Sequence, residues 1–393
     1  MIVRQFLHWV RSAPASERAD ATSALARAYL YSGLTPDDLV AAEGAMIMLL
    51  DDPSPLVRRA LAEVFAGSDQ APPTILHALA ADQPAVATVV LARSPLLLDA
   101  DLVDAVARGG VDIQVAIARR PLLPCAVAAA IAEIGCTEAC LVLLENQGAR
   151  IVPFSLDRIV ARHGHLSAIR NALLDRAGLS APTRQALVAK LSTTLADFVA
   201  ARDWLAEERA RSVVKEACEK ATVALAAVSP NSEVRPLIRH LRDSGQLTAG
   251  LLLRALLCGN ITLFEEALVD LSDISPARVA AIVHDKRGGS FRALYDKAGL
   301  PASIYPAFRE AIEAMREEGF LGESSDASRF KRRIIERVLT RCETEVVGDV
   351  EPLLTLLRRF SAEAAREEAR KFCDELVVES TIATAIENRL SAA

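Results

Sequence analysis

Aromatic side chains are scarce in this 393-residue chain: Phe, Trp and Tyr make up 4% of the sequence, although apolar residues make up 51%. The apolar content is therefore mainly Ala, Leu and Val, which favours packed helices over sheets. Asn-Gly and Asp-Gly hairpin turns are missing, and so are sustained alternating runs of β-branched residues. We expect an all-α protein with about three quarters of its residues in helices, far above the usual one third.

Positive charge is not in excess, since the formal net charge is −6, and this argues against general nucleic-acid binding. No run of 18 apolar residues is present, so no membrane-spanning helix is expected. Arg4 and Arg11 interrupt the first apolar stretch, which favours a first helix over a signal peptide. Seven cysteines without a CxxC pair are typical of isolated thiols in a reducing compartment. These features predict a cytoplasmic protein that binds neither nucleic acid nor membrane.

Motifs for chemistry are also missing: the sequence contains no HExxH, GxSxG, Walker or GxGxxG pattern. Cys136 and Cys140 share a helical face, but no further ligands lie near them, so two core residues are favoured over zinc ligands. His163 and His165 flank Gly164 at a predicted helix end, where they can serve terminal carbonyls. We predict no catalytic residues, no metal site and no cofactor.

What the sequence does contain is helix punctuation and internal repetition. Thr35-Pro36 and Ser54-Pro55 each place a capping residue before a proline at the first helical position. The segment ARSPLL at 92–97 recurs as ARRPLL at 118–123, an offset of 26 residues. Each copy separates two short apolar stretches, so segments 84–108 and 111–134 are predicted to be successive helix pairs that must stack to bury their apolar faces.

The segment from Asp51 to Ala60 is similar to a HEAT repeat, with acid, proline and Val-Arg in order. Asp52 and Arg58 are six residues apart, which resembles the Asp/Arg pair that links neighbouring HEAT repeats. Later units lack this arginine, and their period is shorter than the usual ~40–47 residues. We therefore predict a degenerate HEAT-like solenoid in which Asp52 and Arg58 tie one unit to its neighbour.

After the repeats, the stretch from 184 to 228 contains no Gly or Pro and predicts one or two long helices. Apolar residues step by three and four along it, in a coiled-coil-like stripe: Val214, Cys218, Ala221, Leu225 and Val228. Glu207–Arg211 and Glu216–Lys220 are spaced as ion pairs on its polar side. The predicted organisation is a HEAT-like repeat domain at 1–190, a long helix with a helical bundle at 191–322, and a helical tail at 323–393.

Long phrases at 78–106, 114–123, 241–272 and 291–312 carry a family resemblance, among them ALAADQPAVATVVLARSPLLLDADLVDAV and FRALYDKAGLPASIYPAFREAI. They resemble helical bacterial proteins, chiefly alphaproteobacterial, that are catalogued as a domain of unknown function. The resemblance covers roughly Asp51 to Phe320 and leaves the tail outside. It implies an all-helical, HEAT-like N-terminal half and a bacterial cytosolic origin, but no activity and no site residue.

One loop has the composition of an anion site: Lys286, Arg287, Gly288, Gly289, Ser290 and Arg292. Free N–H groups at a helix start, flanked by three cations, can hold an anion. An ordinary Gly-rich loop with Ser290 as the N-cap is the favoured alternative, because neither a strand nor Walker spacing precedes it.

The tail carries one basic stripe at helical spacing, a candidate for partner contact: Arg329, Arg333, Arg337 and Arg341. Phe330, Ile334, Val338 and Cys342 form an apolar stripe beside it. Acidic residues at 363–368 have the opposite sign, so charge matching within the chain or across a homodimer is favoured over lipid binding.

These features together predict a non-catalytic scaffold or regulatory adaptor that binds a protein partner, with homodimerisation through the tail as a further option. The alternative is a ligand or second-messenger sensor that uses the anion site near 286–292. Ligand-induced thermal shifts with nucleotides would separate the two. An enzyme of an unrecognised helical type is a third option, and a pocket with converging acids or histidines would favour it.

Overall fold

The computed structural model describes residues 9–10, 12–285, 289–318, 327–345 and 351–391, with helical backbone alone after residue 374. Helices account for 76% of the chain, and the described residues form no strand. The all-α prediction is therefore confirmed. The chain divides into two compact units, residues 1–179 and 180–393, and the predicted boundary at 190 falls inside a helix of the second unit.

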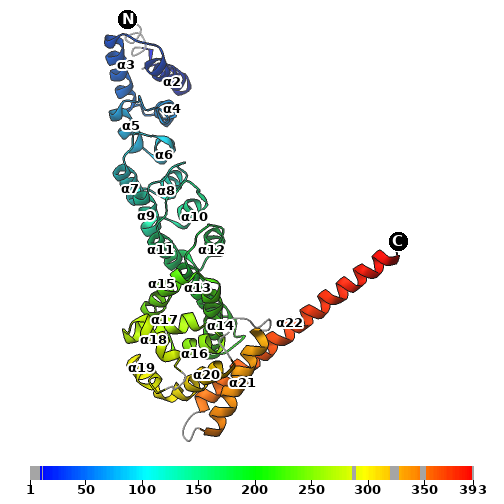
Figure 1. The fold of residues 1–393 in the computed structure, drawn as a ribbon. Coiled ribbons are helices and arrows are strands. Elements are labelled where there is room, and N and C mark those ends of the chain that lie inside the picture. Colours follow the sequence, from blue (N-terminus) through cyan, green and yellow to red (C-terminus); the bar gives the residue numbers. More distant parts are fainter. Residues whose placement is uncertain (1–8, 11, 286–288, 319–326, 346–350, 392–393) are drawn as a thin grey trace. The chain divides into compact units, whose positions relative to one another are not determined.

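Unit 1 is built from short helices joined by brief turns (Figure 1). They are α2 (Ala15–Tyr31), α3 (Pro36–Leu49), α4 (Pro55–Phe65), α5 (Pro73–Ala80), α6 (Pro84–Arg93), α7 (Asp99–Arg108), α8 (Val111–Ala118), α9 (Cys125–Ile134), α10 (Thr137–Glu145), α11 (Pro153–His163) and α12 (Ser167–Leu174). Each even-numbered helix packs on the next even-numbered one, and α7, α9 and α11 pack in the same way. The unit is thus two rows of helices that alternate along the sequence.

The ARxPLL repetition marks equivalent turns in this arrangement. Segments 84–108 and 111–134 are the helix pairs α6–α7 and α8–α9, and Pro95 and Pro121 both lie in the turn inside their pair. Leu97 and Leu123 are buried at the same place in each copy. The two helix pairs are therefore as predicted, while their HEAT-like character remains a prediction.

Arginine and amide side chains connect α8, α10 and α12 each to the preceding even-numbered helix. Arg120, just after α8, donates to the carbonyls of Leu91 and Ser94 at 2.6 and 2.7 Å. Asn146 donates to the carbonyls of Ala118 and Arg120 at 2.8 and 2.7 Å. The last carbonyls of a helix have no partner inside it, so these contacts satisfy polar groups that stacking would otherwise bury unpaired.

The same device continues in both rows of helices. Arg176 donates to the carbonyls of Leu144 and Asn146 at 2.7 and 3.2 Å, next to the C-terminal end of α10. Arg162 of α11 donates to the carbonyls of Ala132 and Gly135, both at 2.7 Å, at the end of α9. We call this series of contacts the carbonyl ladder.

The HEAT-like ion pair differs from the prediction in its partners. Asp52 binds the guanidinium of Arg18 at 2.9 Å, and Arg58 binds Asp82 at 2.6 Å. Arg58 reaches Asp52 only through the backbone carbonyl of that residue, at 2.5 Å. The two residues connect successive helix pairs of unit 1, as expected. They do so through partners in the neighbouring helix pairs rather than through each other.

Replacing Arg58 with alanine should lower stability by about 2 kcal/mol, because it leaves the carboxylate of Asp82 without its cation in a largely buried position. The side chains of Arg58 and Asp82 are only 16% and 14% exposed. Urea unfolding of the full chain measures the effect. Arg59→Ala removes an exposed pair one residue away and is the matched control, which should not change stability measurably. A loss of partner binding at unchanged stability would contradict a structural role for Arg58.

Unit 2 includes several longer helices (Figure 1), and its buried apolar side chains form one core. They are α13 (Ala181–Ala200), α14 (Glu207–Val228), α15 (Asn231–Asp243), α16 (Ala249–Leu257), α17 (Ile261–Ser272), α18 (Pro276–Val283), α19 (Phe291–Lys297), the 3-10 turn η1 (Ala302–Ile304), α20 (Tyr305–Glu318), α21 (Ala327–Glu345) and α22 (Glu351–Ser391). Phe264 and Phe308 stack at 5.7 Å between ring centroids, and Tyr295 packs on Phe308 at 5.4 Å. Six of the 17 aromatic residues of the chain thus belong to this core or pack against it.

The long-helix prediction is met by two helices, α13 and α14, which pack along each other. The face of α14 that is buried is not the predicted stripe, since Thr222, Val223 and Ala226 are buried while Val228 is exposed. Glu207 and Arg211 pair as predicted. Glu216 instead pairs with Arg359 of α22, because the polar side of α14 faces the tail.

The tail contributes to the core of unit 2. Ile334, Val338 and Cys342 of α21 are buried in it, as the apolar stripe predicts. The first part of α22 adds Leu353, Leu354, Leu357, Phe360 and Ala364. Docking within the chain, one of the two predicted options, therefore holds for this part. The later apolar steps, Leu376, Ile382, Ile386 and Leu390, lie where side chains are not described.

Candidate functional site

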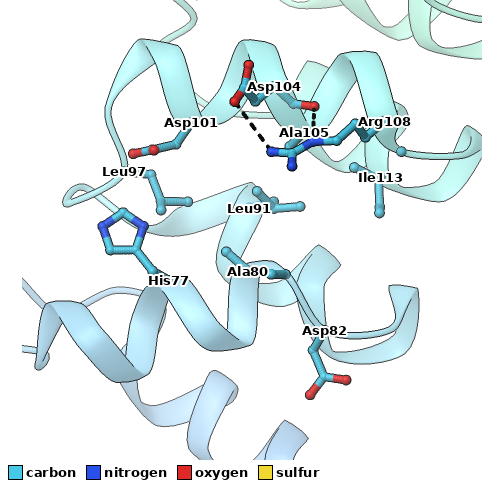
Figure 2. Close-up of a pocket in the computed structure, with 12 residues that line it drawn as sticks. His77, Ala80, Asp82, Leu91, Leu97, Asp101, Asp104, Ala105, Arg108 and Ile113 are labelled. Carbon is cyan, nitrogen blue, oxygen red and sulfur yellow. Dashed lines mark hydrogen bonds and ion pairs between the residues drawn. The ribbon is translucent and has the colours of Figure 1, made fainter.

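A groove of about 330 Å³ lies between two successive helix pairs of unit 1 (Figure 2). Its apolar floor comes from five side chains on four helices and their connections: Ala80, Leu91, Leu97, Ala105 and Ile113. Its polar rim is made by His77 of α5 and by Asp101, Asp104 and Arg108 of α7. An apolar floor with a few polar groups at the edge is the usual composition of a binding site. We call this cavity the unit 1 groove.

The rim residues follow from the way α7 begins and ends. The carboxylate of Asp101 accepts the backbone N–H of Leu98 at 2.9 Å and so caps the helix. Asp104 and Arg108 form a pair one turn apart at 3.4 Å, and both side chains are largely exposed, at 69% and 79%. This pair contributes little to stability, so both side chains remain available to a ligand.

A glycine closes the far end of the groove. A Cβ at Gly109 would lie 2.5 Å from Cγ2 of Ile113 and 2.6 Å from the carbonyl oxygen of Ala105. The absence of a side chain therefore allows α7 and α8 to approach and lets Ile113 form part of the floor.

The lining of the groove combines charged and apolar groups. It contains carboxylates, one imidazole and one guanidinium over an alkyl floor, and these polar groups can bind N–H donors and can also transfer protons. Asp101 and Asp104 attract N–H donors, and the floor accepts an aliphatic side chain. A short peptide segment with a basic and an aliphatic residue matches this lining.

The predicted anion loop is only partly within the described residues, because Lys286, Arg287 and Gly288 lie outside them. Ser290 is the N-cap residue of α19, and its side chain makes no capping hydrogen bond. Arg292 pairs with Asp296 at 2.9 Å and lies over the ring of Tyr305 at 4.4 Å. These contacts engage Arg292 on its own helix and η1–α20, and anion binding at this loop remains a prediction.

The arginines of the predicted basic stripe of α21 differ in their surroundings. Arg341 pairs with buried Glu310 at 3.2 Å, Arg333 is exposed, and the side chain of Arg329 lies outside the described part. The acidic residues at 363–368 pair with two other cations of α21. Lys331 binds Glu367 at 3.0 Å, and Arg332 binds Glu368 at 2.9 Å. Partner contact through the stripe remains a prediction.

The cysteine and histidine residues singled out by spacing have structural contacts. The sulfur of Cys136 accepts the N–H of Ala139 at 3.4 Å and caps α10. Cys140 is buried, and burial raises the pKa of its thiol to about 11, which makes it a poor nucleophile. His163 contacts Thr137 at 3.3 Å, and burial lowers its pKa. Within the described ranges, no three His, Cys, Asp or Glu residues gather as a metal site would require.

The sequence analysis did not predict the unit 1 groove. Gly109 was the one signal present, since a Cβ there would clash with Ile113 of α8. No helix of the described parts has both the length and the apolar character that crossing a bilayer requires.

Comparison with known proteins places the chain within one family. Residues 86–348, more than half of the chain, match the family described as "Uncharacterised protein conserved in bacteria (DUF2336)". The match begins after α5 and includes α21, so the expected extent of Asp51 to Phe320 was too early at both ends. No curated protein and no solved structure matches the chain.

Proposed function

The chain belongs to the bacterial family DUF2336, and from this premise we propose that it is a non-catalytic helical adaptor that binds a protein partner in the cytoplasm. The observation that carries the proposal is the unit 1 groove, whose apolar floor lies between helix pairs and whose rim pair, Asp104 and Arg108, is exposed. Helical repeats commonly use such surfaces to hold other proteins.

The polar side chains of unit 1 support the same proposal. The carbonyl ladder uses Arg120, Arg162 and Arg176. Carboxylates of neighbouring helix pairs bind Arg18 and Arg58. These arginines connect the helix pairs of unit 1. The exposed rim pair Asp104 and Arg108 is not needed for those connections, so it can serve binding.

The test compares two arginine substitutions on α7. Ala105 is part of the groove floor, whereas Ala107 is exposed and does not line it. We expect Ala105→Arg to fill the groove and to lower recovery of the partner at least about tenfold, equivalent to about 1.4 kcal/mol of binding free energy. Ala107→Arg adds the same charge and should bind as the wild type does.

The measurement is affinity purification of the full chain from a bacterium that expresses it, followed by mass spectrometry. Thermal unfolding of each variant ensures that equal amounts of folded protein are compared. Equal recovery of every co-purifying protein with Ala105→Arg and with wild type would contradict partner binding in the groove.

A further inference from the structure

A second cavity lies wholly within unit 2 and has a different character from the unit 1 groove. It has a volume of about 390 Å³ and lies between the α13–α14 pair and the turn that joins α15 to α16. Its walls include apolar side chains from all four helices, α13 to α16: Ala189, Ala196, Val214, Leu241 and Leu251. Cavities of this size accommodate a small organic ligand. We call it the unit 2 cavity.

Charged residues of α14 are ordered along one side of this cavity. Arg211, Lys215 and Glu219 all line it and follow one another at intervals of four residues, which separates neighbours by about 6 Å along a helix. Arg211 and Lys215 are exposed, while Glu219 is half-buried. The cavity therefore has cations near its opening and a carboxylate farther inside.

The inner carboxylate is held in place by the start of α16. Oε1 of Glu219 accepts the hydroxyl of Thr248 at 3.2 Å, and Thr248 is the N-cap residue of that helix. Burial is the main reason why the pKa of Glu219 is raised, although Lys215 and Arg254 lower it. A ligand that donates N–H groups to this carboxylate would supply the hydrogen bonds that water provides to an exposed carboxylate.

A series of side-chain hydrogen bonds orients the amide group of Gln246, which also lines the cavity. Nε2 of His240 contacts Oε1 of Gln185 at 3.0 Å, and Nε2 of Gln185 donates to Oε1 of Gln246 at 2.6 Å. Gln185 is fully buried, so the chain is anchored in the core. Since the amide oxygen of Gln246 faces Gln185, the group that Gln246 can present to a ligand is its NH₂ donor.

From this arrangement we propose that the unit 2 cavity binds a purine nucleotide, with the base inside and the phosphate at the opening. A half-buried carboxylate and an amide donor that line the same cavity match a base edge that carries an N–H group next to an acceptor, as adenine and guanine both do. The apolar walls accept a flat ring. Lys215, one turn towards solvent, lies where a 5′-phosphate would need positive charge. Arg211, one turn farther out, pairs with the exposed Glu207 and would exchange that partner for the phosphate.

This site is separate from the unit 1 groove, so either proposal can fail without the other. It also differs from the predicted anion loop at 286–292, because its cations are Arg211 and Lys215 and its selectivity comes from Glu219. The thiol of Cys218 also lines the cavity, and burial raises its pKa, which makes it a weak donor rather than a nucleophile.

Isothermal titration calorimetry of the full chain tests the proposal with four probes: GMP, AMP, ribose 5-phosphate and inorganic phosphate. We expect at least one nucleotide to bind at least tenfold more tightly than ribose 5-phosphate, and the comparison of GMP with AMP identifies the base. Glu219→Gln should weaken the preferred nucleotide tenfold or more. Lys215→Ala should weaken the nucleotide but not the corresponding nucleoside.

Glu208→Gln is the matched control, because Glu208 is an exposed carboxylate of the same helix that does not line this cavity, and it should bind as wild type does. Circular dichroism ensures that each variant is folded. If Glu219→Gln does not fold, Ala189→Leu fills the cavity from α13 and should abolish binding instead. Failure of both nucleotides to bind, binding of ribose 5-phosphate as tight as that of the nucleotides, or unchanged affinity in the folded cavity variant would each overturn the proposal.

Discussion

Replacing Gly148 with alanine is expected to lower the thermal midpoint of the full chain by roughly 6–12 °C, which corresponds to about 3 kcal/mol in a unit of this size. A Cβ at this position would lie 1.8 Å from the carbonyl oxygen of Pro121. The obstacle is backbone, which cannot rotate away as a side chain would. The close approach exists because Leu123 donates to the carbonyl of Gly148 at 3.2 Å and accepts from Arg150 at 3.0 Å.

Gly44→Ala is the matched control for this substitution. Gly44 lies inside α3 of the same unit, and a Cβ there would meet no atom within 4 Å. Alanine is favoured over glycine in a helix interior by about 0.5–1 kcal/mol, so this variant should be slightly more stable than wild type. Thermal unfolding followed by circular dichroism measures both variants. A midpoint for Gly148→Ala equal to that of wild type would show that the two turns do not pack as described.

Removing the carboxylate of Glu363 is expected to destabilise unit 2 by about 3 kcal/mol, because it leaves a buried guanidinium without its counter-charge. Arg254 is 5% exposed, binds Glu363 at 2.5 Å and lies 4.3 Å from the ring centroid of Phe360. Its Nε and Nη2 atoms have no hydrogen-bond partner among the described residues. Glu363 and Phe360 are both in α22, so Glu363→Ala should also release the tail from the core.

The asymmetry between the two partners makes this prediction specific. Arg254→Met replaces the cation with an apolar side chain of similar length, and we expect it to cost less than Glu363→Ala does. Glu368→Ala is the control on the same helix, because its partner Arg332 is 42% exposed, and it should change stability little. Urea unfolding gives the energies, and limited proteolysis of the tail reports release. A larger loss for Arg254→Met than for Glu363→Ala would contradict the described pairing.

Much of the fold follows from short-range features of the sequence. The side chain of Thr35 caps α3 and Pro36 begins it, because capping geometry depends on a few neighbouring residues. The ARxPLL repetition located two equivalent turns, since proline cannot continue a helix and the same leucine is buried in each copy. Periodicity also found Ile334, Val338 and Cys342 in the core, where the apolar stripe of one helix dictates its orientation.

Partners that are distant in the sequence were less predictable. Asp52 and Arg58 were expected to tie one repeat to its neighbour, but a spacing of six residues does not reveal that their partners are Arg18 and Asp82. Glu216 has a suitable cation four residues away on its own helix and binds Arg359 instead, because packing of α22 brings a second cation close. Neither cavity was found, since cavities arise from the shapes of several elements and Glu219 looks in sequence like any exposed acid of an amphipathic helix.

The direction of the carbonyl ladder has a consequence for synthesis on the ribosome. At each rung the donor comes later in the chain than the carbonyl it binds: Arg120 reaches back to α6, Asn146 to α8 and Arg176 to α10. In a nascent chain each helix pair can therefore form first, and the side chain that binds its terminal carbonyls is synthesised soon afterwards. If folding proceeds from the N-terminal end one helix pair at a time, the apolar surface that the emerging chain exposes is limited to about that of one helix pair.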